Sequence, residues 1–325
     1  MQIQLGADSM PLRIVTYNLR YDSQPDNITV QQSLDRLPDP LTGPGYFRKR
    51  GEQPWSLRRL RVAEQLLGEG IVLAGFQEAL VRQVYDLAEL FGPDWDWVGV
   101  GRDDGVEAGE YSPIFYKKSE LVLLSYDSFW TSNTPFEPSR FPGAGSHRVC
   151  TTLHLQRRTD GKKFTVLNTH MDDRSEAQRR HAASMILARA RYEAITTSCP
   201  VFAMGDFNSP PDGRDSGAYE IATGVRTPSA LPADFAARFP VPADAPLFVL
   251  HDLRAHTPRR AVSANHATFT GFDAPNDTHA WNRIDFVFGG ANGGWEATGY
   301  KVDSALSDDG VLASDHRPVF ADVRI

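Results

Sequence analysis

The chain lacks the features that mark several large classes of protein. Its 325 residues include only two cysteines, Cys150 and Cys199, which excludes a disulfide framework and a zinc site built from cysteine pairs. No apolar run approaches the roughly 20 residues that a membrane-spanning helix needs, so we expect no transmembrane segment. Sequence repeats with a period of roughly 20–50 residues and heptads are also lacking, which argues against solenoids and coiled coils.

Positive charge is in short supply as well. The 34 Lys and Arg residues face 41 Asp and Glu residues, which gives a formal net charge of −7. This balance disfavours a protein that coats long nucleic acids through a basic surface, although an enzyme that contacts a few phosphates stays open. The apolar fraction of 41% and the charged fraction of 23% are typical of a globular protein.

The N-terminus carries no basic start followed by an apolar core, so no signal peptide is visible. A cytoplasmic location is the default expectation, and secretion stays open if a leader was removed. We predict a short N-terminal tail over residues 1–11 and one catalytic domain over 12–325, acting as a monomer.

Short apolar runs rich in Val, Ile, Phe and Thr predict most of the strands. They are Leu12–Asn18, Ile71–Gln77, Trp97–Gly101, Ser112–Tyr116, Leu121–Ser125, Arg148–Leu155, Phe164–Thr169, Val201–Gly205, Arg283–Phe288, Tyr300–Asp303 and Pro318–Ile325. Helical periodicity predicts helices over Trp55–Gly68, Val81–Phe91 and Ser175 to about Thr196. Two irregular stretches, Asp22–Pro54 and Ser209–Pro258, separate these elements. The pattern predicts a mixed α/β fold with two packed sheets.

Polar residues collect at or near the ends of the predicted strands. They are Asn18, Glu78, His170, Asp206, Asn208, Asp285, Asp315 and His316. Open α/β sheets place sites outside strand ends, so this clustering is what one catalytic cleft would produce. Carboxylate and amide oxygens suit a hard divalent cation, while the two histidines suit phosphate contact or proton transfer. Asp285 could orient His316 by accepting its second ring N–H.

Taken singly, each of these residues has an ordinary structural explanation. An Asn or Asp after a strand is usually a turn or helix-cap residue, and a Glu there often begins a helix. A lone histidine such as His316 is more often structural than catalytic. Only the joint pattern favours a catalytic site.

That pattern resembles the endonuclease/exonuclease/phosphatase superfamily, the deoxyribonuclease I-like enzymes, from Arg13 to Ile325. Six motifs follow one another in the family's order: Thr-Tyr-Asn18-Leu-Arg, Phe-Gln-Glu78, Asn-Thr-His170, Gly-Asp206-Phe-Asn208, Arg-Ile-Asp285-Phe and Ser-Asp315-His316. Any one of these short motifs is weak evidence, whereas six in sequence are specific.

The resemblance implies a four-layered α/β sandwich of two mainly antiparallel sheets flanked by helices. It also implies a phosphate-ester substrate and a Mg²⁺ or Mn²⁺ cofactor that assists the attack of water on phosphorus. Glu78 would hold the metal, with Asn18 near it and Asp315 in its coordination shell.

The same resemblance implies roles for the remaining motif residues. Asp206 would orient or deprotonate the attacking water, and Asn208 would hydrogen-bond phosphate or water. His316, held by Asp285, and His170 would stabilise charge on the phosphorane oxygens.

The segment Gly99–Gly105, followed by Gly109–Tyr116, resembles a largely uncharacterised subgroup. That subgroup often continues its third motif as His-x-Asp-His-x-Gly with an Arg shortly after, whereas this chain has Asp173 in place of the second His and Ser175 in place of the Gly, with Arg179 at the later Arg. Substrate inferences from closer relatives are weakened by these departures. The residues that we expect to contact substrate are Arg102, Asp103, Glu110, Tyr111, Asp172 and His266. For Arg102 a structural salt bridge to a neighbouring carboxylate is the competing interpretation.

These observations favour a metal-dependent phosphoesterase acting on a small phosphorylated sugar, lipid headgroup or nucleotide. The first alternative is a nuclease, exonuclease or deadenylase-like, on single-stranded nucleic acid, which the acidic charge does not favour. The second is a catalytically silent binding module or a non-phosphate hydrolase on the same fold.

Overall fold

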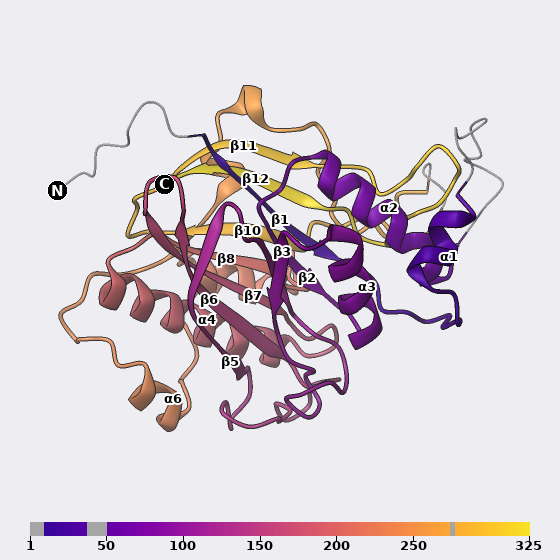
Figure 1. Cartoon of the computed structure of the whole chain (residues 1–325). Helices are drawn as coiled ribbons and strands as arrows, with labels where there is room; N and C mark the ends of the chain where they lie inside the picture. The colour runs from indigo at the N-terminus through magenta and orange to yellow at the C-terminus, as the bar shows by residue number, and fades with distance from the viewer. Residues whose placement is uncertain (1–9, 38–50, 274–276) are drawn as a thin grey trace.

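Two six-stranded sheets pack face to face in the computed structural model (Figure 1). The structure describes residues 10–37, 51–273 and 277–325, so residues 1–9 of the predicted tail lie outside it. One sheet has the strand order β11-β12-β1-β2-β4-β3, and the other has the order β5-β6-β7-β8-β10-β9.

Within the described residues, twelve strands make up the two sheets. They are β1 Leu12–Asn18, β2 Leu73–Gln77, β3 Trp95–Val98, β4 Ile114–Lys117, β5 Leu121–Trp130, β6 Val149–Arg157, β7 Lys163–His170, β8 Val201–Asp206, β9 Leu250–Asp252, β10 Asp285–Gly290, β11 Glu296–Val302 and β12 Val319–Arg324. The helices are α1 Val30–Asp35, α2 Trp55–Gly68, α3 Val81–Phe91, α4 Glu176–Thr197, α5 Gly217–Ala222, α6 Ala233–Arg238 and α7 Leu253–His256, with a 3₁₀ turn at Arg259–Ala261.

Each sheet has a parallel pair at its centre and antiparallel pairs around it. The parallel pairs are β1 with β2 and β7 with β8, and every other neighbouring pair in the two sheets is antiparallel. The predicted pair of mainly antiparallel sheets is therefore confirmed. Because parallel strands end at the same edge of a sheet, Asn18, Gln77, His170 and Asp206 all emerge at one end of the sandwich.

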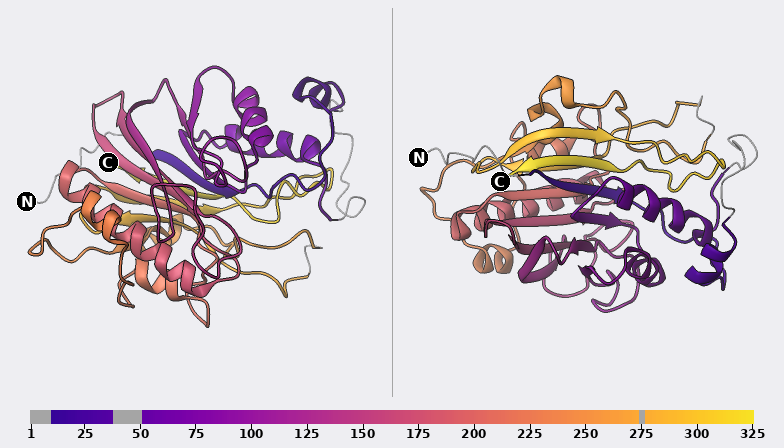
Figure 2. Two further views of the ribbon diagram at one scale, coloured as in Figure 1. Left: turned by 90° about the horizontal axis from the view of Figure 1, so that it is seen from below. Right: turned by 45° about the horizontal axis from the view of Figure 1, so that its top comes forward.

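Helices cover the outer face of each sheet and complete four layers (Figure 2). Helices α2 and α3 pack on one sheet through a cluster that contains Val62, Leu87 and Phe76. Helices α4, α5 and α6 pack on the other sheet through Ile186, Phe235 and their neighbours. Within the described ranges, every helix is too short or too polar to cross a lipid bilayer.

The two-residue period of the strands explains how polar residues reach the space between the sheets. In β1, Leu12 and Ile14 join the core between the sheets, and Asn18 continues that face. In β8, Phe202 and Met204 lie in the same core, and Asp206 continues their face. The inter-sheet core therefore changes from apolar to polar at the end of the strands where the site lies.

A buried polar bridge joins the two sheets just below that end. Gln77 donates from Nε2 to Asn168 Oδ1 at 2.7 Å and to Thr16 Oγ1 at 3.0 Å. Asn168 in turn donates to the carbonyls of Phe76 and Pro113. Because each of these side chains is hydrogen-bonded, the bridge fixes the register between the sheets without leaving buried polar groups unpaired.

The predicted elements differ from the observed ones mainly at edges and in the irregular stretches. Helices α2 and α3 begin and end as predicted. Strand β5 continues five residues beyond Ser125, because a bulge between Leu123 and Ser125 interrupts its alternation and its edge position exposes Tyr126. The two irregular stretches contain short helices and β9, which are too brief to show a periodic pattern.

Candidate active site

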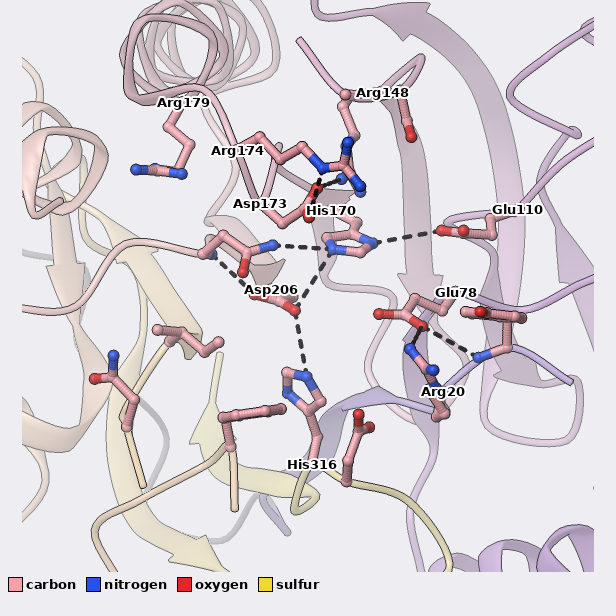
Figure 3. A pocket seen from close by; sticks show the side chains of 18 of the residues that line it. Arg20, Glu78, Glu110, Arg148, His170, Asp173, Arg174, Arg179, Asp206 and His316 are labelled. Atoms are coloured by element: carbon pink, nitrogen blue, oxygen red, sulfur yellow. Dashed lines mark hydrogen bonds and ion pairs between the residues drawn. The ribbon is translucent and has the colours of Figure 1, made fainter. Parts of the chain in front are cut away.

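A cavity of about 880 Å³ opens at the end of the sandwich where β1, β2, β7 and β8 finish (Figure 3). We call it the main cavity. Most of its lining residues are charged or polar, and the full set is Arg20, Tyr21, Glu78, Arg102, Glu110, Gly145, Ser146, Arg148, His170, Asp173, Arg174, Arg179, Asp206, Asn208, Pro210, Asp215, Phe269, Ala280, Asn282, Ile284, Asp315 and His316.

Asp206 lies between two histidines on the floor of this cavity (Figure 3). Its Oδ2 atom is 3.6 Å from Nε2 of His170 and 3.6 Å from Nε2 of His316. Behind His316, Asp285 accepts a hydrogen bond from Nδ1 at 2.8 Å, which directs Nε2 toward Asp206. The structure thus brings these four predicted residues together, and Asn208 joins them through a 3.1 Å contact between Nδ2 and Nε2 of His170.

The two histidines carry opposite protonation tendencies. Burial alone would lower the pKa of His316, but the carboxylates of Asp285, Asp206 and Asp315 raise it to about 10. Burial, with the positive charges of Arg148 and Arg102, lowers the pKa of His170 well below its ordinary value. His316 is therefore an imidazolium and His170 a neutral imidazole at neutral pH.

Burial and the negative charge of Asp285 raise the pKa of Asp206. A carboxylate with a raised pKa is a stronger base than an exposed aspartate. Acid–base sites typically contain neighbouring groups whose pKa values are shifted in opposite directions. Here the pKa of His316 is raised and that of the nearby His170 is lowered.

Arg102 and Glu110 form a bidentate ion pair on the cavity wall. Nη1 and Nη2 of Arg102 donate to the two carboxylate oxygens of Glu110 at 2.6 and 2.8 Å. Glu110 Oε2 also lies 3.8 Å from Nδ1 of His170. Burial raises the pKa of Glu110 to about 7 in spite of Arg102. The geometry of Arg102 matches the competing interpretation, a salt bridge to a neighbouring carboxylate. Glu110 faces Nδ1 of His170 beyond hydrogen-bond distance, in contrast to the 2.8 Å bond between Asp285 and His316.

Glu78 and Asp315 are the carboxylates that suit a divalent cation. Both line the main cavity, and the negative charge of Glu78 adds to burial in raising the pKa of Asp315. Two carboxylates that repel each other in one cavity fit a cation between them. Asn18 is turned so that Nδ2 donates to Glu78 Oε1 and to Asp206 Oδ2, both at 3.0 Å, while its oxygen accepts from Arg20 N–H. Asn18 thus orients the carboxylates, and its oxygen is engaged elsewhere.

A second group of potential ligands consists of Asp206, Asp285 and His316, whose ligand atoms lie within 4.8 Å of one another. This trio is a poor cation site, because His316 is protonated and its Nδ1 is bonded to Asp285. The positive charge of protonated His316 explains why the carboxylates of Asp285 and Asp206 lie close together, so the cluster needs no metal ion to hold it.

Three residues around the cavity adopt a left-handed backbone that side chains rarely take. Arg20, Glu78 and Asn208 have φ angles of 57°, 59° and 46°. Such conformations cost of order 1 kcal/mol or more each and concentrate at functional sites. The strain places all three side chains at the main cavity.

Four arginines at the cavity were not predicted as site residues: Arg20, Arg148, Arg174 and Arg179. Asp173 accepts from Nη2 of Arg148 at 2.9 Å, so the departure from the subgroup's third motif neutralises this guanidinium. Two of them carried a sequence signal: Arg20 directly follows the first motif's Asn-Leu pair, and Arg179 stands where the subgroup has an Arg shortly after its third motif. Arg148 and Arg174 reach the cavity only through tertiary packing.

Four of the residues expected to contact substrate do not line the main cavity. Asp103 pairs with His147 at 3.0 Å, and the Tyr111 hydroxyl donates to the Val106 carbonyl. Asp172 is fully buried and accepts hydrogen bonds from backbone N–H groups. His266 lines a separate cavity next to the main one.

The chain is similar to known proteins in sequence and in fold. The Endonuclease/Exonuclease/phosphatase family model matches residues 15–316. The structure resembles an endonuclease/exonuclease/phosphatase from Bacteroides vulgatus, with 28% identity and a TM-score of 0.74, over 98% of this chain and 100% of that one. A mannosyl-6-phosphatase from Bacteroides thetaiotaomicron is 24% identical with a TM-score of 0.71, over 97% and 100% of the two chains.

A third structure, D. rerio TDP2 complexed with a single-strand DNA product, is 14% identical with a TM-score of 0.59, over 97% of this chain and 99% of that one. No curated protein sequence matches the chain significantly. Since the family model spans most of the sequence and all six motifs lie within it, the chain belongs to the Endonuclease/Exonuclease/phosphatase family.

Proposed function

We propose that this protein is a divalent-metal-dependent phosphoesterase that hydrolyses a small phosphate ester through attack of water on phosphorus. The observation that carries the proposal is the position of Asp206 between a protonated and a neutral histidine on the cavity floor. Family membership supports hydrolase chemistry at this position.

Asp206 is the group best placed to orient the attacking water and accept its proton, because its raised pKa makes it basic. The imidazolium of His316 directs its Nε2–H into the cavity, where it can donate to an oxygen of the phosphoryl group as negative charge develops. His170 and Asn208 border the same point and supply further polar contacts. Asp285 keeps His316 in the protonated, correctly oriented form.

Glu78 and Asp315 are the residues that would hold Mg²⁺ or Mn²⁺, with Asn18 fixing the orientation of Glu78. When bound, the cation supplies Lewis-acid stabilisation of the charge on the phosphoryl and leaving oxygens. Arg20, 3.9 Å from Glu78, adds a permanent positive charge at this side of the cavity.

A small substrate fits the dimensions and the charge of the molecule. The main cavity lies within the range of about 300–1,000 Å³ that small-molecule sites occupy. The net charge of −7 weighs against broad contact with a long polynucleotide. One protein with this fold acts on mannosyl-6-phosphate by its name, so the fold accommodates such chemistry.

The test is a panel of phosphate esters assayed with Mg²⁺, Mn²⁺ or EDTA. The panel contains p-nitrophenyl phosphate, bis-p-nitrophenyl phosphate, sugar and inositol phosphates, and single-stranded DNA and RNA. We expect EDTA to abolish turnover and Asp206→Asn to lower kcat by about 10²–10⁴-fold. The exposed Asp244→Asn variant is the matched control and should retain full turnover. Turnover that survives both EDTA and Asp206→Asn would refute the mechanism, and turnover confined to nucleic acid would favour a nuclease.

A further inference from the structure

A second cavity of about 470 Å³ lies beside the main one. We call it the side cavity. Its lining is mostly polar side chains with one indole, and the residues are Pro211, Asp212, Ala264, Asn265, His266, Ala267, Trp281, Asn282, Arg283 and Arg317. None of the roles assigned above uses this space.

The side cavity adjoins the place where the phosphate would react. Asn282 lines both cavities. In three places, two consecutive residues line different cavities. Pro210, Ile284 and His316 line the main cavity, and their chain neighbours Pro211, Arg283 and Arg317 line the side cavity. A substrate whose phosphate meets His316 can therefore extend its organic part into the side cavity.

The polar groups of the side cavity offer both donors and acceptors. Asn265 donates from Nδ2 to the Val302 carbonyl, which leaves its oxygen as an acceptor. Asn282 accepts from the backbone N–H of Arg283 through Oδ1, which leaves its Nδ2 as a donor. Partial desolvation and the nearby Arg254 and Arg283 lower the pKa of His266, so its neutral ring offers one donor and one acceptor. Hydroxyl groups, which donate and accept at once, match this mixture.

The charges of the side cavity nearly cancel. Arg283 is held by two 2.7 Å hydrogen bonds to Asp252, so its charge is neutralised within the protein. Arg317 and Asp212 carry opposite charges. A second phosphate would be matched best by several guanidinium groups free of carboxylate partners. Among the described residues the side cavity offers one, Arg317, which donates to the Ala267 carbonyl and lies over the Trp281 ring. The near-zero net charge therefore favours a neutral group.

A nucleobase fits this lining less well than a sugar. Bases are usually held by stacking on aromatic faces, and the side cavity has one indole. The guanidinium of Arg317 already lies 4.4 Å from the centroid of the Trp281 ring, so one face of the indole is covered. Trp281 and Pro211 still provide apolar surface for the C–H groups of a saturated ring.

We propose that the side cavity binds the polyhydroxylated part of the substrate, a sugar or cyclitol, through Asp212, Asn265, His266 and Asn282, while the phosphate lies in the main cavity. This inference rests on the proposed function and names the substrate class as a phosphate ester of a neutral polyol.

The test compares substrates that differ in hydroxyl groups. Mannose 6-phosphate and myo-inositol 1-phosphate are assayed beside p-nitrophenyl phosphate, whose leaving group offers no sugar hydroxyls. In the Asp212→Ala/His266→Ala double variant, we expect the kcat/KM ratio of polyol phosphate to p-nitrophenyl phosphate to fall about tenfold, because two hydrogen bonds to hydroxyls are lost. Both residues are exposed, so the fold tolerates the change. The control, Asp244→Ala/His256→Ala, removes the same side-chain types outside both cavities and should leave the ratio unchanged.

An unchanged ratio in the double variant would overturn the inference, as would an equal fall for all substrates. If the unaltered protein hydrolyses no phosphate ester, the proposed function fails, and the side cavity is then judged by binding alone. Ligand-observed NMR with free mannose and free myo-inositol serves that purpose. Binding that the double variant loses would support the side cavity as a polyol site, and no binding to the unaltered protein would refute it.

Discussion

At the scale of single residues, Gly205 shows why the residue before a catalytic carboxylate has to lack a side chain. Its φ angle is 143°, and a Cβ atom there would meet the carbonyl oxygen of Thr169 at 2.0 Å. Strand β8 lies against β7 at this point, with His170 opposite Asp206. A side chain at position 205 would therefore push apart the two strands that carry the site.

Gly205→Ala should lower the free energy of unfolding by about 3 kcal/mol and lower kcat by at least about 10²-fold. Denaturant unfolding and steady-state assays measure the two effects. Gly68→Ala is the matched control, because nothing lies within 4 Å of the added Cβ at that helix position. That variant should keep full activity, and full activity in Gly205→Ala would contradict the steric explanation.

Asp172 illustrates a carboxylate whose task is structural. It accepts hydrogen bonds from the backbone N–H groups of Gly145, Ser146, Arg174 and Ser175. Burial opposes its ionisation, but these bonds and Arg148 lower its pKa below the ordinary 3.8. Since the folded pKa is the lower one, the stabilisation is complete above the unfolded pKa and is lost as the pH falls through the folded value.

Asp172→Asn should therefore lower the free energy of unfolding by about 1.5–3 kcal/mol at pH 7. The difference from the unaltered protein should shrink below about pH 4, where the unfolded carboxyl is protonated. Urea unfolding at pH 7 and pH 3 measures both effects, with the exposed Asp244→Asn as control. A difference that is the same at both pH values would refute the assignment.

The motif residues were predictable from sequence, because short signatures fix Asn18, Glu78, Asp206 and His316 at strand ends. Arg148 was not, since its position at the cavity depends on packing against Asp172 and Asp173 rather than on any local pattern. The exclusion of Asp103 and Tyr111 from the main cavity likewise depends on how a loop folds back on itself.

At the scale of elements, helix α2 braces the segments that carry the first and the last of the six motifs. The fully buried guanidinium of Arg58 donates to the carbonyls of Leu19, Arg20 and Tyr21 after β1. It also donates to the carbonyl of Ala313, two residues before Asp315. A helix that looks merely amphipathic in sequence thus determines the distance between the first and last motifs.

Arg58→Lys should lower the free energy of unfolding by about 3 kcal/mol or more, because a lysine ammonium cannot reach four carbonyls in this planar arrangement. Urea unfolding measures the loss. Arg36→Lys changes an exposed arginine and should leave stability within about 0.5 kcal/mol. Equal stability of the two variants would show that the brace contributes nothing.

Long, strongly periodic elements were predicted well, and short ones were not. Helices α2 and α3 have enough turns for their apolar face to show in the sequence. Helices α1, α5 and α6 have six residues each, fewer than two turns, so they depend largely on tertiary contacts, with a capping box between Thr29 and Gln32 added in α1. Strand β9 is three residues long and is defined by its pairing with β10.

At the scale of the whole molecule, the negative net charge coexists with a cavity that gathers guanidinium groups. Glu110, Asp173 and Asp215 pair with cavity arginines. Asp206 faces two histidines instead, Glu78 has Arg20 only at 3.9 Å, and Asp315 has no ion pair among the described residues. A divalent cation bound there would reduce this local negative charge.

Mg²⁺ should therefore raise the thermal stability of the protein, by about 2.7 kcal/mol at a concentration one hundred times the dissociation constant. Differential scanning fluorimetry with increasing Mg²⁺ measures the shift in Tm. Glu78→Gln should abolish the shift, while Asp173→Asn, a carboxylate change in the same cavity, should keep it. A full shift in Glu78→Gln would exclude Glu78 as a metal ligand.

The left-handed backbone at Arg20, Glu78 and Asn208 has a consequence for laboratory evolution. Glycine adopts these conformations without the steric cost that a side chain carries, so substitution there relieves strain. Selection for heat resistance alone would favour glycine at these positions, and glycine would remove functional side chains from the main cavity. A thermostable variant of this protein therefore has to be selected for turnover and heat resistance together.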